Sequence, residues 1–89
     1  MSHYQLILYS KPDCHLCEGL LEKLQALTHP KFSLEIRDIT TRSEWFEAYQ
    51  LEVPILVQVF DGQQIVLPRF SPRASLRQLE QRLDLYLQR

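Results

Sequence analysis

The chain has 89 residues, with ten Lys and Arg against eleven Asp and Glu and a formal net charge of −1 at pH 7. This length suits one domain with a modest core, which we expect to span residues 1–89. A net charge near zero gives no indication of nucleic-acid or membrane binding. The amino-terminal residues lack the basic and apolar regions of an export signal, and no apolar run reaches transmembrane length, so we expect a cytoplasmic protein.

A strand, a turn and a helix are predicted in the first third of the chain. Residues 4–9 form a strand that is nearly continuous in apolar side chains from Leu6 onward, which is typical of a buried position. A helix from about Cys14 to Leu27 follows, and Thr28-His29-Pro30 ends it. The apolar residues that recur at helical spacing on the face of the two cysteines are Leu20, Leu21, Leu24 and Leu27.

The middle of the chain predicts a second strand and a short helix. Residues 32–39 alternate apolar with polar side chains, the period of a half-covered strand near a sheet edge. Thr41 and Glu44 have the spacing of a capping box, in which Thr41 accepts from a backbone N–H and Glu44 reaches back. The helix that they open is short and ends near Gln50.

A hairpin and a last helix are predicted for the rest of the chain. Residues 55–60 give the strongest strand pattern, and Asp61-Gly62 is a two-residue turn signal of the primed type before a returning strand at 64–67. Ser71-Pro72 fits an N-cap followed by proline at the first helical position. The side chains expected on the buried stripe of this helix are Leu76, Leu79, Leu83 and Tyr86. The order β-α-β-α-β-β-α predicts an α/β fold with a four-stranded mixed sheet and three helices.

The only two cysteines, Cys14 and Cys17, follow the first strand, at the sheet end where open α/β folds place their functional sites. At a helix start, unpaired N–H groups and the helix dipole favour a thiolate, which lowers a thiol pKa from about 8.5 to roughly 3.5–7.5. We therefore expect Cys14 to attack disulfides and Cys17 to resolve the mixed disulfide. In a reducing compartment this spacing predicts redox or metal chemistry rather than a structural disulfide.

Three segments make the chain resemble glutaredoxin-like proteins of the thioredoxin fold, over essentially its whole length. They are Lys11-Pro12-Asp13-Cys14-His15-Leu16-Cys17, Val53-Pro54 before the third strand, and Phe60-Asp61-Gly62 in the hairpin. The resemblance implies the sheet order 2-1-3-4, with the first and third helices on one face. It also implies Cys14 as the nucleophile and Cys17 as the resolving cysteine.

The same resemblance implies further site residues. Pro54 would be cis and face the cysteine pair, and Val53 would offer backbone groups to an incoming peptide or glutathione. Lys11 would contact a carboxylate of glutathione. Taken alone, Pro54 is also explained as a proline at a strand start, and Lys11 as a solvated loop lysine.

Two neighbours of Cys14 would modulate its chemistry in opposite directions. A protonated His15 would stabilise the thiolate and make the pair more oxidising, whereas Asp13 would disfavour a second anion nearby. The direction of the change in reduction potential therefore stays open. His15-Leu16 also stands where glutaredoxins usually carry Pro-Tyr or a similar pair.

A second departure from the family pattern lies before the last helix. Residues 68–75 lack the Gly-Gly turn and the Cys-Asp-Asp-like start that bind glutathione in glutaredoxins. Arg69, Arg73 and Arg77 recur at four-residue spacing in this region. They can bind a carboxylate or phosphate, or they can form a solvated face paired with Glu80.

The predicted activity is thiol–disulfide exchange on disulfide-containing proteins or glutathione mixed disulfides, by a monomer that needs no metal or organic cofactor. Glutathione stays open as a co-substrate. Two alternative functions use the same cysteines. The thiols can switch partner binding without turnover, or two thiolates can supply half of a zinc or iron–sulfur site.

Overall fold

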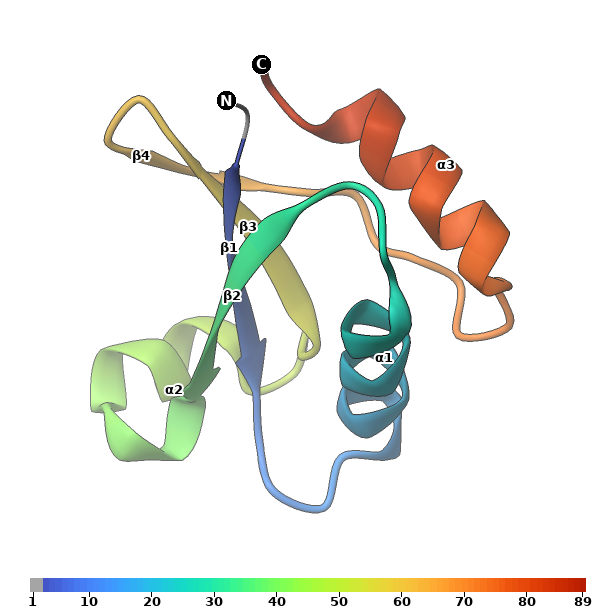
Figure 1. Cartoon of the computed structure of the whole chain (residues 1–89). Helices are drawn as coiled ribbons and strands as arrows, with labels where there is room; N and C mark the ends of the chain where they lie inside the picture. The colour runs from blue at the N-terminus through green and yellow to red at the C-terminus, as the bar shows by residue number, and fades with distance from the viewer. Residues whose placement is uncertain (1–2) are drawn as a thin grey trace.

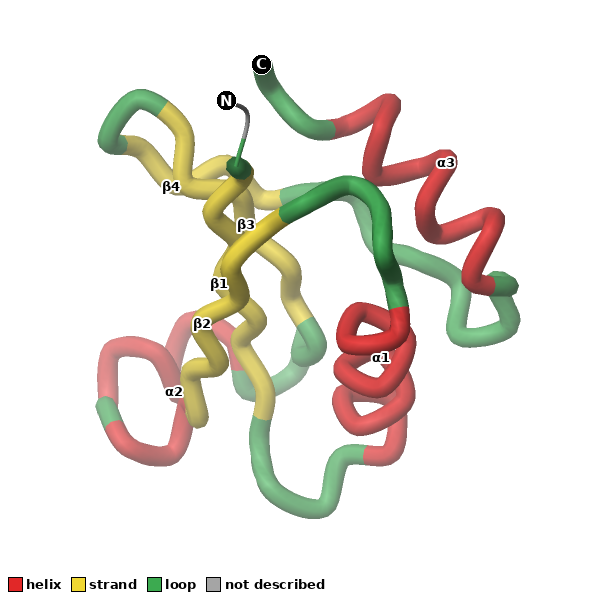
Figure 2. The backbone as a smooth tube through the Cα atoms, viewed as in Figure 1, coloured by secondary structure: helices red, strands yellow, loops and turns green. Residues whose placement is uncertain are grey.

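The computed structural model describes residues 3–89, and Figures 1 and 2 show the course of the chain. The strands are β1 (Tyr4–Ser10), β2 (Phe32–Asp38), β3 (Ile55–Phe60) and β4 (Gln63–Val66). The helices are α1 (His15–Ala26), α2 (Ser43–Tyr49) and α3 (Leu76–Tyr86), with a short 3-10 helix, η1 (Ile39–Thr41), before α2. In the described part of the chain, no helix has the length and apolar character needed to cross a membrane.

The four strands form one mixed sheet in the order β2-β1-β3-β4. β1 pairs parallel with β2 and antiparallel with β3, which in turn pairs antiparallel with β4. The apolar run of β1 is buried on both sides and occupies a central position, whereas the alternating β2 lies at an edge. The predicted α/β thioredoxin fold, with its sheet order and three helices, is confirmed.

Helices cover both faces of this sheet, with α1 and α3 on one side and α2 on the other (Figure 1). On the side of α1 and α3, which we call the leucine face, the buried residues are Leu6, Leu8, Leu24, Leu56, Leu67, Leu79, Leu83 and Leu87. On the side of α2, which we call the aromatic face, they are Ile7, Tyr9, Cys17, Ile39, Val53, Ile55 and Val57. Alternate residues of β1 and β3 therefore contribute to different cores.

The turn between β3 and β4 has the predicted geometry. Asp61 and Gly62 have φ values of 58° and 76°, and a primed turn of type I′ requires such left-handed values at both central positions. Gly62 adopts them without a Cβ clash, and Asp tolerates them better than most residues. The hairpin prediction is confirmed, with β4 starting at Gln63.

The capping box predicted at Thr41 and Glu44 is wrong. The Thr41 hydroxyl donates to the Asp38 carbonyl oxygen at 2.7 Å, within the η1 turn. The N-cap of α2 is Arg42, whose side chain makes no capping hydrogen bond. The Asp38 carboxylate caps η1 instead, accepting from the Thr40 N–H. The tight connection from β2 to α2 uses the residues that the local pattern assigned to a helix start.

The start of α3 also differs from the prediction, because Ser71-Pro72 does not open the helix. The Ser71 carbonyl accepts from the Ala74 N–H at 3.0 Å and closes a separate turn. Ser75 is the N-cap of α3, and Ser75 and Gln78 form a complete capping box. Both serines are suitable caps locally, and the path of the preceding loop selects the second one.

The buried stripe of α3 is shorter at its start than predicted. Leu79 and Leu83 are buried and Tyr86 is half-buried, but Leu76 in the first turn is 44% exposed. Leu87, directly after the helix, is buried in the leucine face. The apolar stripe is therefore displaced toward the end of the chain.

One polar side chain is buried in the leucine face. Gln58 of β3 is 1% exposed and lies opposite Leu6 of β1, so both side chains point to the same side of the sheet. The Gln58 amide donates to the Gln88 carbonyl at 2.9 Å, and its oxygen accepts from the Gln88 N–H at 2.7 Å. These two bonds attach the segment after α3 to the sheet.

Candidate active site

The loop of residues 11–14 joins the carboxyl end of β1 to α1 (Figure 1). Asp13 has a φ of 58°, a left-handed conformation that Asp tolerates better than most residues. The turn places Cys14 as the N-cap of α1, with an extended backbone. The Cys14 Sγ accepts from the Cys17 N–H at 3.3 Å. It therefore satisfies one of the free N–H groups at the helix start, as the side-chain oxygen of an N-cap residue usually does.

Cys14 and Cys17 are joined by a disulfide, and their Cα atoms are 5.2 Å apart. The two cysteines differ in exposure. Cys17 is 3% exposed and belongs to the aromatic face, whereas Cys14 is only partly buried and packs against the margin of that cluster. A reactant in solvent can therefore approach Cys14, while the protein encloses Cys17.

The loop before β3 lies at the same end of the sheet, because β3 runs antiparallel to β1 and its first residue, Ile55, pairs with Tyr9. The Val53–Pro54 peptide bond in this loop is cis. Val53 is 9% exposed and packs in the same cluster as Cys17. Its N–H donates to the Tyr49 carbonyl at 3.1 Å, while its carbonyl has no hydrogen-bond partner among residues 3–89. Of the two backbone groups of Val53 that were predicted to face a peptide or glutathione, the N–H is thus already bonded within the protein.

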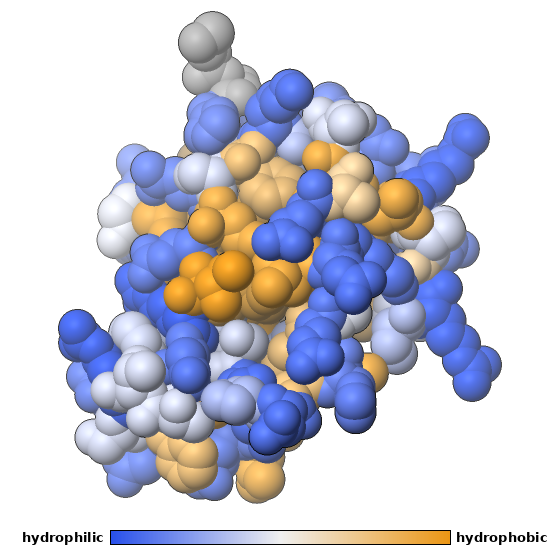
Figure 3. All heavy atoms as spheres, turned by 60° about the horizontal axis from the view of Figure 1, so that its bottom comes forward, coloured by the Kyte–Doolittle hydropathy of each residue, from blue (hydrophilic) through white to orange (hydrophobic). Residues whose placement is uncertain are grey.

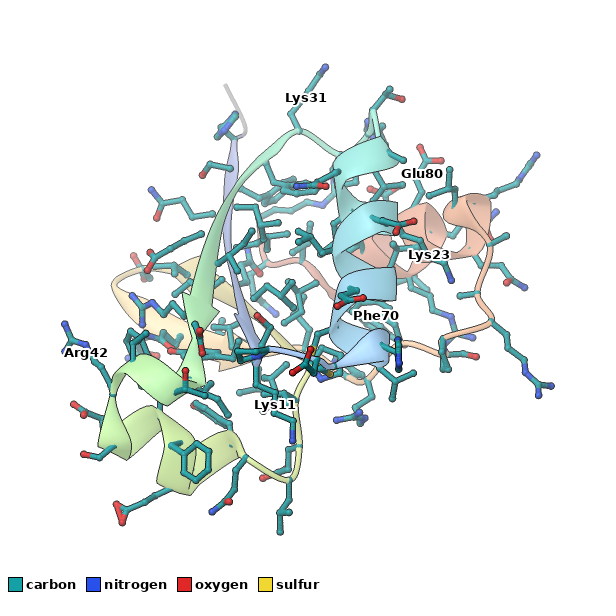
Figure 4. All side chains as sticks on the ribbon, turned by 90° about the horizontal axis from the view of Figure 1, so that it is seen from below. Lys11, Lys23, Lys31, Arg42, Phe70 and Glu80 are labelled. Atoms are coloured by element: carbon teal, nitrogen blue, oxygen red, sulfur yellow. A yellow bond between two sulfur atoms is a disulfide. The ribbon has the colours of Figure 1, made fainter. Side chains whose placement is uncertain are left out.

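Lys11 and His15 lie on either side of Cys14 and are both exposed. The Lys11 Nζ donates to the Gln50 carbonyl at 3.4 Å and so connects the loop of residues 11–14 to the end of α2 (Figure 4). His15 is the first residue of α1. In Figure 3 this end of the molecule is turned forward, and apolar side chains form a patch there with hydrophilic side chains around it. The surface near the disulfide is therefore apolar in part.

A pocket of about 290 Å³ lies beside the Cys-x-x-Cys turn. Its walls come from α1 as far as Lys23, from residues around Pro54, from the segment that connects β4 to α3, and from Leu79 of α3. Leu16, between the two cysteines, is one of the lining residues, and Gly19, Leu20 and Phe70 are others. Most of the lining side chains are apolar.

Two basic side chains hold the segment between β4 and α3 in place. The Lys23 Nζ donates to the carbonyls of Pro72, at 2.8 Å, and Ala74, at 2.7 Å (Figure 4). The Arg69 guanidinium donates to the Glu52 carbonyl, in the loop before β3. Both cations line the pocket, and both are engaged by backbone oxygens.

The three arginines that recur in the sequence do not form one helical stripe. Arg69 precedes the Ser71 turn, Arg73 lies within it, and only Arg77 belongs to α3. Arg73 and Arg77 are exposed, and Arg77 makes no ion pair with Glu80 among the residues that the structure describes. Of the two alternatives left open for these arginines, the solvated face therefore lacks the ion pair with Glu80 that was predicted for it.

A network of aromatic and cationic groups supports the aromatic face. The Tyr9 hydroxyl donates to the Gln64 Oε1 at 2.9 Å and accepts from the Arg37 Nη1 at 3.0 Å. The guanidinium carbons of Arg37 and Arg42 each lie 5.0 Å from the Trp45 ring centroid, within cation–π range. The bond to the neighbouring Glu35 carboxylate and then the bond to Tyr9 raise the pKa of Arg37 above its ordinary value, although partial burial opposes them.

The sheet order and the Cys-x-x-Cys site at the start of α1 define a protein of the thioredoxin fold. Within that class, a family model described as Glutaredoxin-like domain (DUF836) matches residues 5–84, and the chain belongs to this family. The matched residues include both cysteines and every element from β1 to most of α3. A comparison with curated proteins gives no match. A glutaredoxin-like domain with a Cys-x-x-Cys disulfide relates the protein to redox chemistry.

The structure brings most of the predicted site residues to one end of the sheet. Cys14, Cys17 and Val53 pack in or against one cluster. Pro54 and Arg69 instead line the pocket. The catalytic and binding roles of all these residues stay predictions.

Three residues of this region escaped the sequence reasoning, namely Gly19, Lys23 and Phe70. Pro68 and Pro72 indicate a restrained loop around Phe70, but no local signal shows that this loop folds back along α1. The partners of Lys23 lie about fifty residues away in sequence, so its spacing carries no information about them.

Proposed function

We propose that this protein is a thiol–disulfide oxidoreductase that reduces protein disulfides or glutathione mixed disulfides through Cys14. The difference between the two sulfur atoms carries the proposal. Cys14 is partly exposed at the N-cap of α1, and Cys17 is 3% exposed behind it. A nucleophile must be reached by its substrate, whereas a resolving thiol must stay close to the nucleophile and protected from solvent.

The position of Cys14 supports a reactive thiolate in the reduced protein. At the N-cap, a Cys14 thiolate would accept the Cys17 N–H and face the positive end of the α1 dipole. A hydrogen bond to the charged form and a nearby positive potential both favour that form. We therefore expect the pKa of the reduced Cys14 thiol to lie below the value of about 8.5 for free cysteine.

The reaction would proceed by two successive exchanges. The Cys14 thiolate attacks one sulfur of the substrate disulfide, and the other substrate sulfur leaves as a thiolate that takes a proton from water. The Cys17 thiolate then attacks the Cys14 Sγ, which breaks the mixed disulfide and releases the second substrate thiol. The substrate gains two electrons, and the protein ends with the Cys14–Cys17 disulfide, the state present in this structure.

A new cycle requires a cellular dithiol or glutathione to reduce that disulfide. A reducing compartment such as the cytoplasm is therefore the setting that the proposed cycle needs. The exchange itself uses only sulfur chemistry and requires no metal or organic cofactor.

Reduction of insulin in the presence of dithiothreitol tests the proposal. We expect Cys14→Ser to lower turnover to the rate without protein, because the attacking sulfur is gone. Cys17→Ser, reduced and then freed of dithiothreitol, should accumulate a mixed disulfide with insulin on Cys14, visible by mass spectrometry, because no second thiol resolves it. Wild-type protein alkylated with iodoacetamide is the control for loss of both thiols. Equal turnover by wild type and Cys14→Ser would refute the proposal.

Two other outcomes would point to the alternative functions. If no disulfide is turned over but a partner binds only one redox state, the thiols act as a switch. Visible absorption by the freshly isolated protein would indicate a bound iron–sulfur cluster. Within residues 3–89, no group of three or more His, Cys, Asp and Glu side chains is placed to hold a metal ion.

A further inference from the structure

The pocket beside the Cys-x-x-Cys turn adjoins the redox site at two points. Leu16, which separates the two cysteines in sequence, is 49% exposed and forms part of the wall. Pro54 forms another part and directly follows Val53, which packs in the same cluster as Cys17. When a cysteine of a polypeptide substrate has its sulfur at Cys14, the side chain of an adjacent substrate residue would therefore lie next to the pocket.

The pocket reaches down to the leucine face. Leu56, Leu67 and Leu79, which are buried members of that core, contribute to its lining. Leu20 and Phe70, both half-buried, complete the apolar wall. An apolar side chain that moves from water into these surroundings is stabilised in proportion to the apolar area that it buries.

The charged groups of the pocket are poorly suited to the two carboxylates of glutathione. The Lys23 ammonium is engaged by two carbonyl oxygens and the Arg69 guanidinium by a third. Glu52, which also lines the pocket, adds a negative charge, and His15 is the remaining group at the rim that can become cationic. A ligand with two carboxylates would have to share Lys23 and Arg69 with the backbone carbonyls that they already bind, and it would lie near the Glu52 carboxylate.

The volume of about 290 Å³ indicates what can enter. It exceeds the roughly 150 Å³ cavity that holds one benzene ring and lies just below the range of about 300–1,000 Å³ for drug-sized ligands. We propose that this pocket binds one large aromatic or aliphatic side chain that flanks a disulfide cysteine of a polypeptide substrate. The inference rests on the proposed oxidoreductase function and narrows its substrates to protein disulfides with apolar neighbours.

Gly19 offers a direct way to test the pocket. It lines the pocket in α1, and a Cβ added there meets nothing within 4 Å. Gly19→Leu should therefore fill the pocket without a backbone clash, in a helix where Leu is favoured over Gly. The matched control is Gln25→Leu, which adds the same side chain to an exposed position of α1 outside the pocket.

The substrates are two peptide disulfides that differ only in the residues on both sides of the cysteine, Phe in one and Ser in the other. With wild type and dithiothreitol, we expect kcat/KM for the Phe peptide to exceed that for the Ser peptide by about tenfold or more, the discrimination that burial of an aromatic ring allows. Gly19→Leu should bring this ratio close to one, and Gln25→Leu should preserve it. Circular dichroism checks that each variant is folded.

A second measurement does not depend on any variant. A Phe peptide with Ser in place of its cysteine should inhibit reduction of the Phe peptide disulfide competitively, and the matching Ser peptide should inhibit at least about tenfold more weakly.

The outcomes separate this inference from the proposed function. If wild type reduces neither peptide, or Cys14→Ser reduces both as well as wild type, the oxidoreductase proposal fails. If wild type reduces both peptides through Cys14 at equal rates, that proposal stands and the pocket inference is overturned. A third substrate is the mixed disulfide between glutathione and the Ser peptide. If wild type reduces it faster than the Phe peptide disulfide, the pocket inference is also overturned, because the pocket would then serve glutathione.

Discussion

The two faces of the sheet are built from different side chains. The buried apolar residues of the leucine face are all leucines, and α1 and α3 cover them. The aromatic face combines β-branched residues with Tyr9 and Cys17, and the rings of Trp45 and Tyr49 pack against it. The leucine face is continuous with the pocket, whereas the aromatic face encloses the second sulfur. The proposed recognition of an apolar side chain and the proposed sulfur chemistry would therefore depend on opposite sides of one sheet, with α1 contributing to both.

The largest expected effect comes from the leucine face. Leu83→Ala removes a fully buried side chain, and such changes cost about 2–5 kcal/mol, a large share of the roughly 5–15 kcal/mol of a typical domain. Urea unfolding measures the loss, and Leu85→Ala, at a position 78% exposed on the same helix, is the control. In the folded variant the alkylation rate of reduced Cys14 should match that of wild type. A changed rate would mean that the two faces are not independent.

A smaller loss of stability is expected when Gln58, the buried polar side chain of the leucine face, is replaced. Gln58→Ala removes both hydrogen bonds to the Gln88 backbone, and each net bond contributes about 0.5–1.5 kcal/mol, so we expect a loss of about 2 kcal/mol. Hydrogen exchange should show faster exchange of the Gln88 amide. The control is Gln63→Ala, at an exposed position of β4. Unchanged protection at Gln88 would contradict the anchoring role.

Removal of one hydroxyl from the aromatic face should lower the free energy of unfolding by less than the loss of the Gln58 side chain. Tyr9→Phe keeps the ring but removes the group that links Arg37 to Gln64, and we expect a loss of about 1 kcal/mol in urea unfolding. Tyr49→Phe is the matched control, since the Tyr49 hydroxyl has no hydrogen-bond partner among residues 3–89. If the Tyr49 variant loses as much stability as the Tyr9 variant, ring packing rather than the hydroxyl network stabilises this face.

The smallest expected effect on stability comes from a change to the cap of η1, the short helix that places Ile39 in the aromatic face. Bonds from the Thr40 hydroxyl and then the Thr40 N–H lower the pKa of Asp38. A carboxyl with a lowered folded pKa stabilises the protein above its unfolded pKa, and this contribution disappears as the pH falls through the folded pKa. Asp38→Asn should therefore be slightly less stable than wild type at pH 7, and the difference should vanish in acid below the folded pKa.

Urea unfolding of wild type and Asp38→Asn at the two pH values measures this difference. Glu47→Gln, which alters an exposed carboxylate of α2, is the control. A difference between wild type and Asp38→Asn that persists below the folded pKa of Asp38 would contradict the capping role of the carboxylate.

Features that depend on neighbours in sequence were predictable. The apolar run of β1 predicted a buried strand, and Asp61-Gly62 predicted a hairpin, because both follow from local burial period and turn conformation. Cys14 and Cys17 likewise predicted a helix-start site, since their spacing fits one turn of helix.

Helix starts were predicted less well, because several segments offer equally good caps. Thr41 and Ser71 each have a hydroxyl at a suitable spacing, yet both belong to turns that precede the helices. Ser75 and Gln78 make the capping box that the loop geometry allows. Capping by hydroxyls is worth only about 1 kcal/mol, so the path that best packs the loop decides which cap is used.

The sequence by itself determined the order of the elements, the hairpin and the cysteine pair at the start of α1, because each depends on residues within one turn or one strand. Only the tertiary structure decided that Cys17 is buried while Cys14 is accessible, and that residues 67–74 fold along α1 to form a pocket. Those features arise from contacts such as that of Lys23 with the Pro72 and Ala74 carbonyls, which join distant parts of the chain. The local sequence pattern cannot predict such contacts, because only the packing of the whole chain brings Lys23 close to these carbonyls.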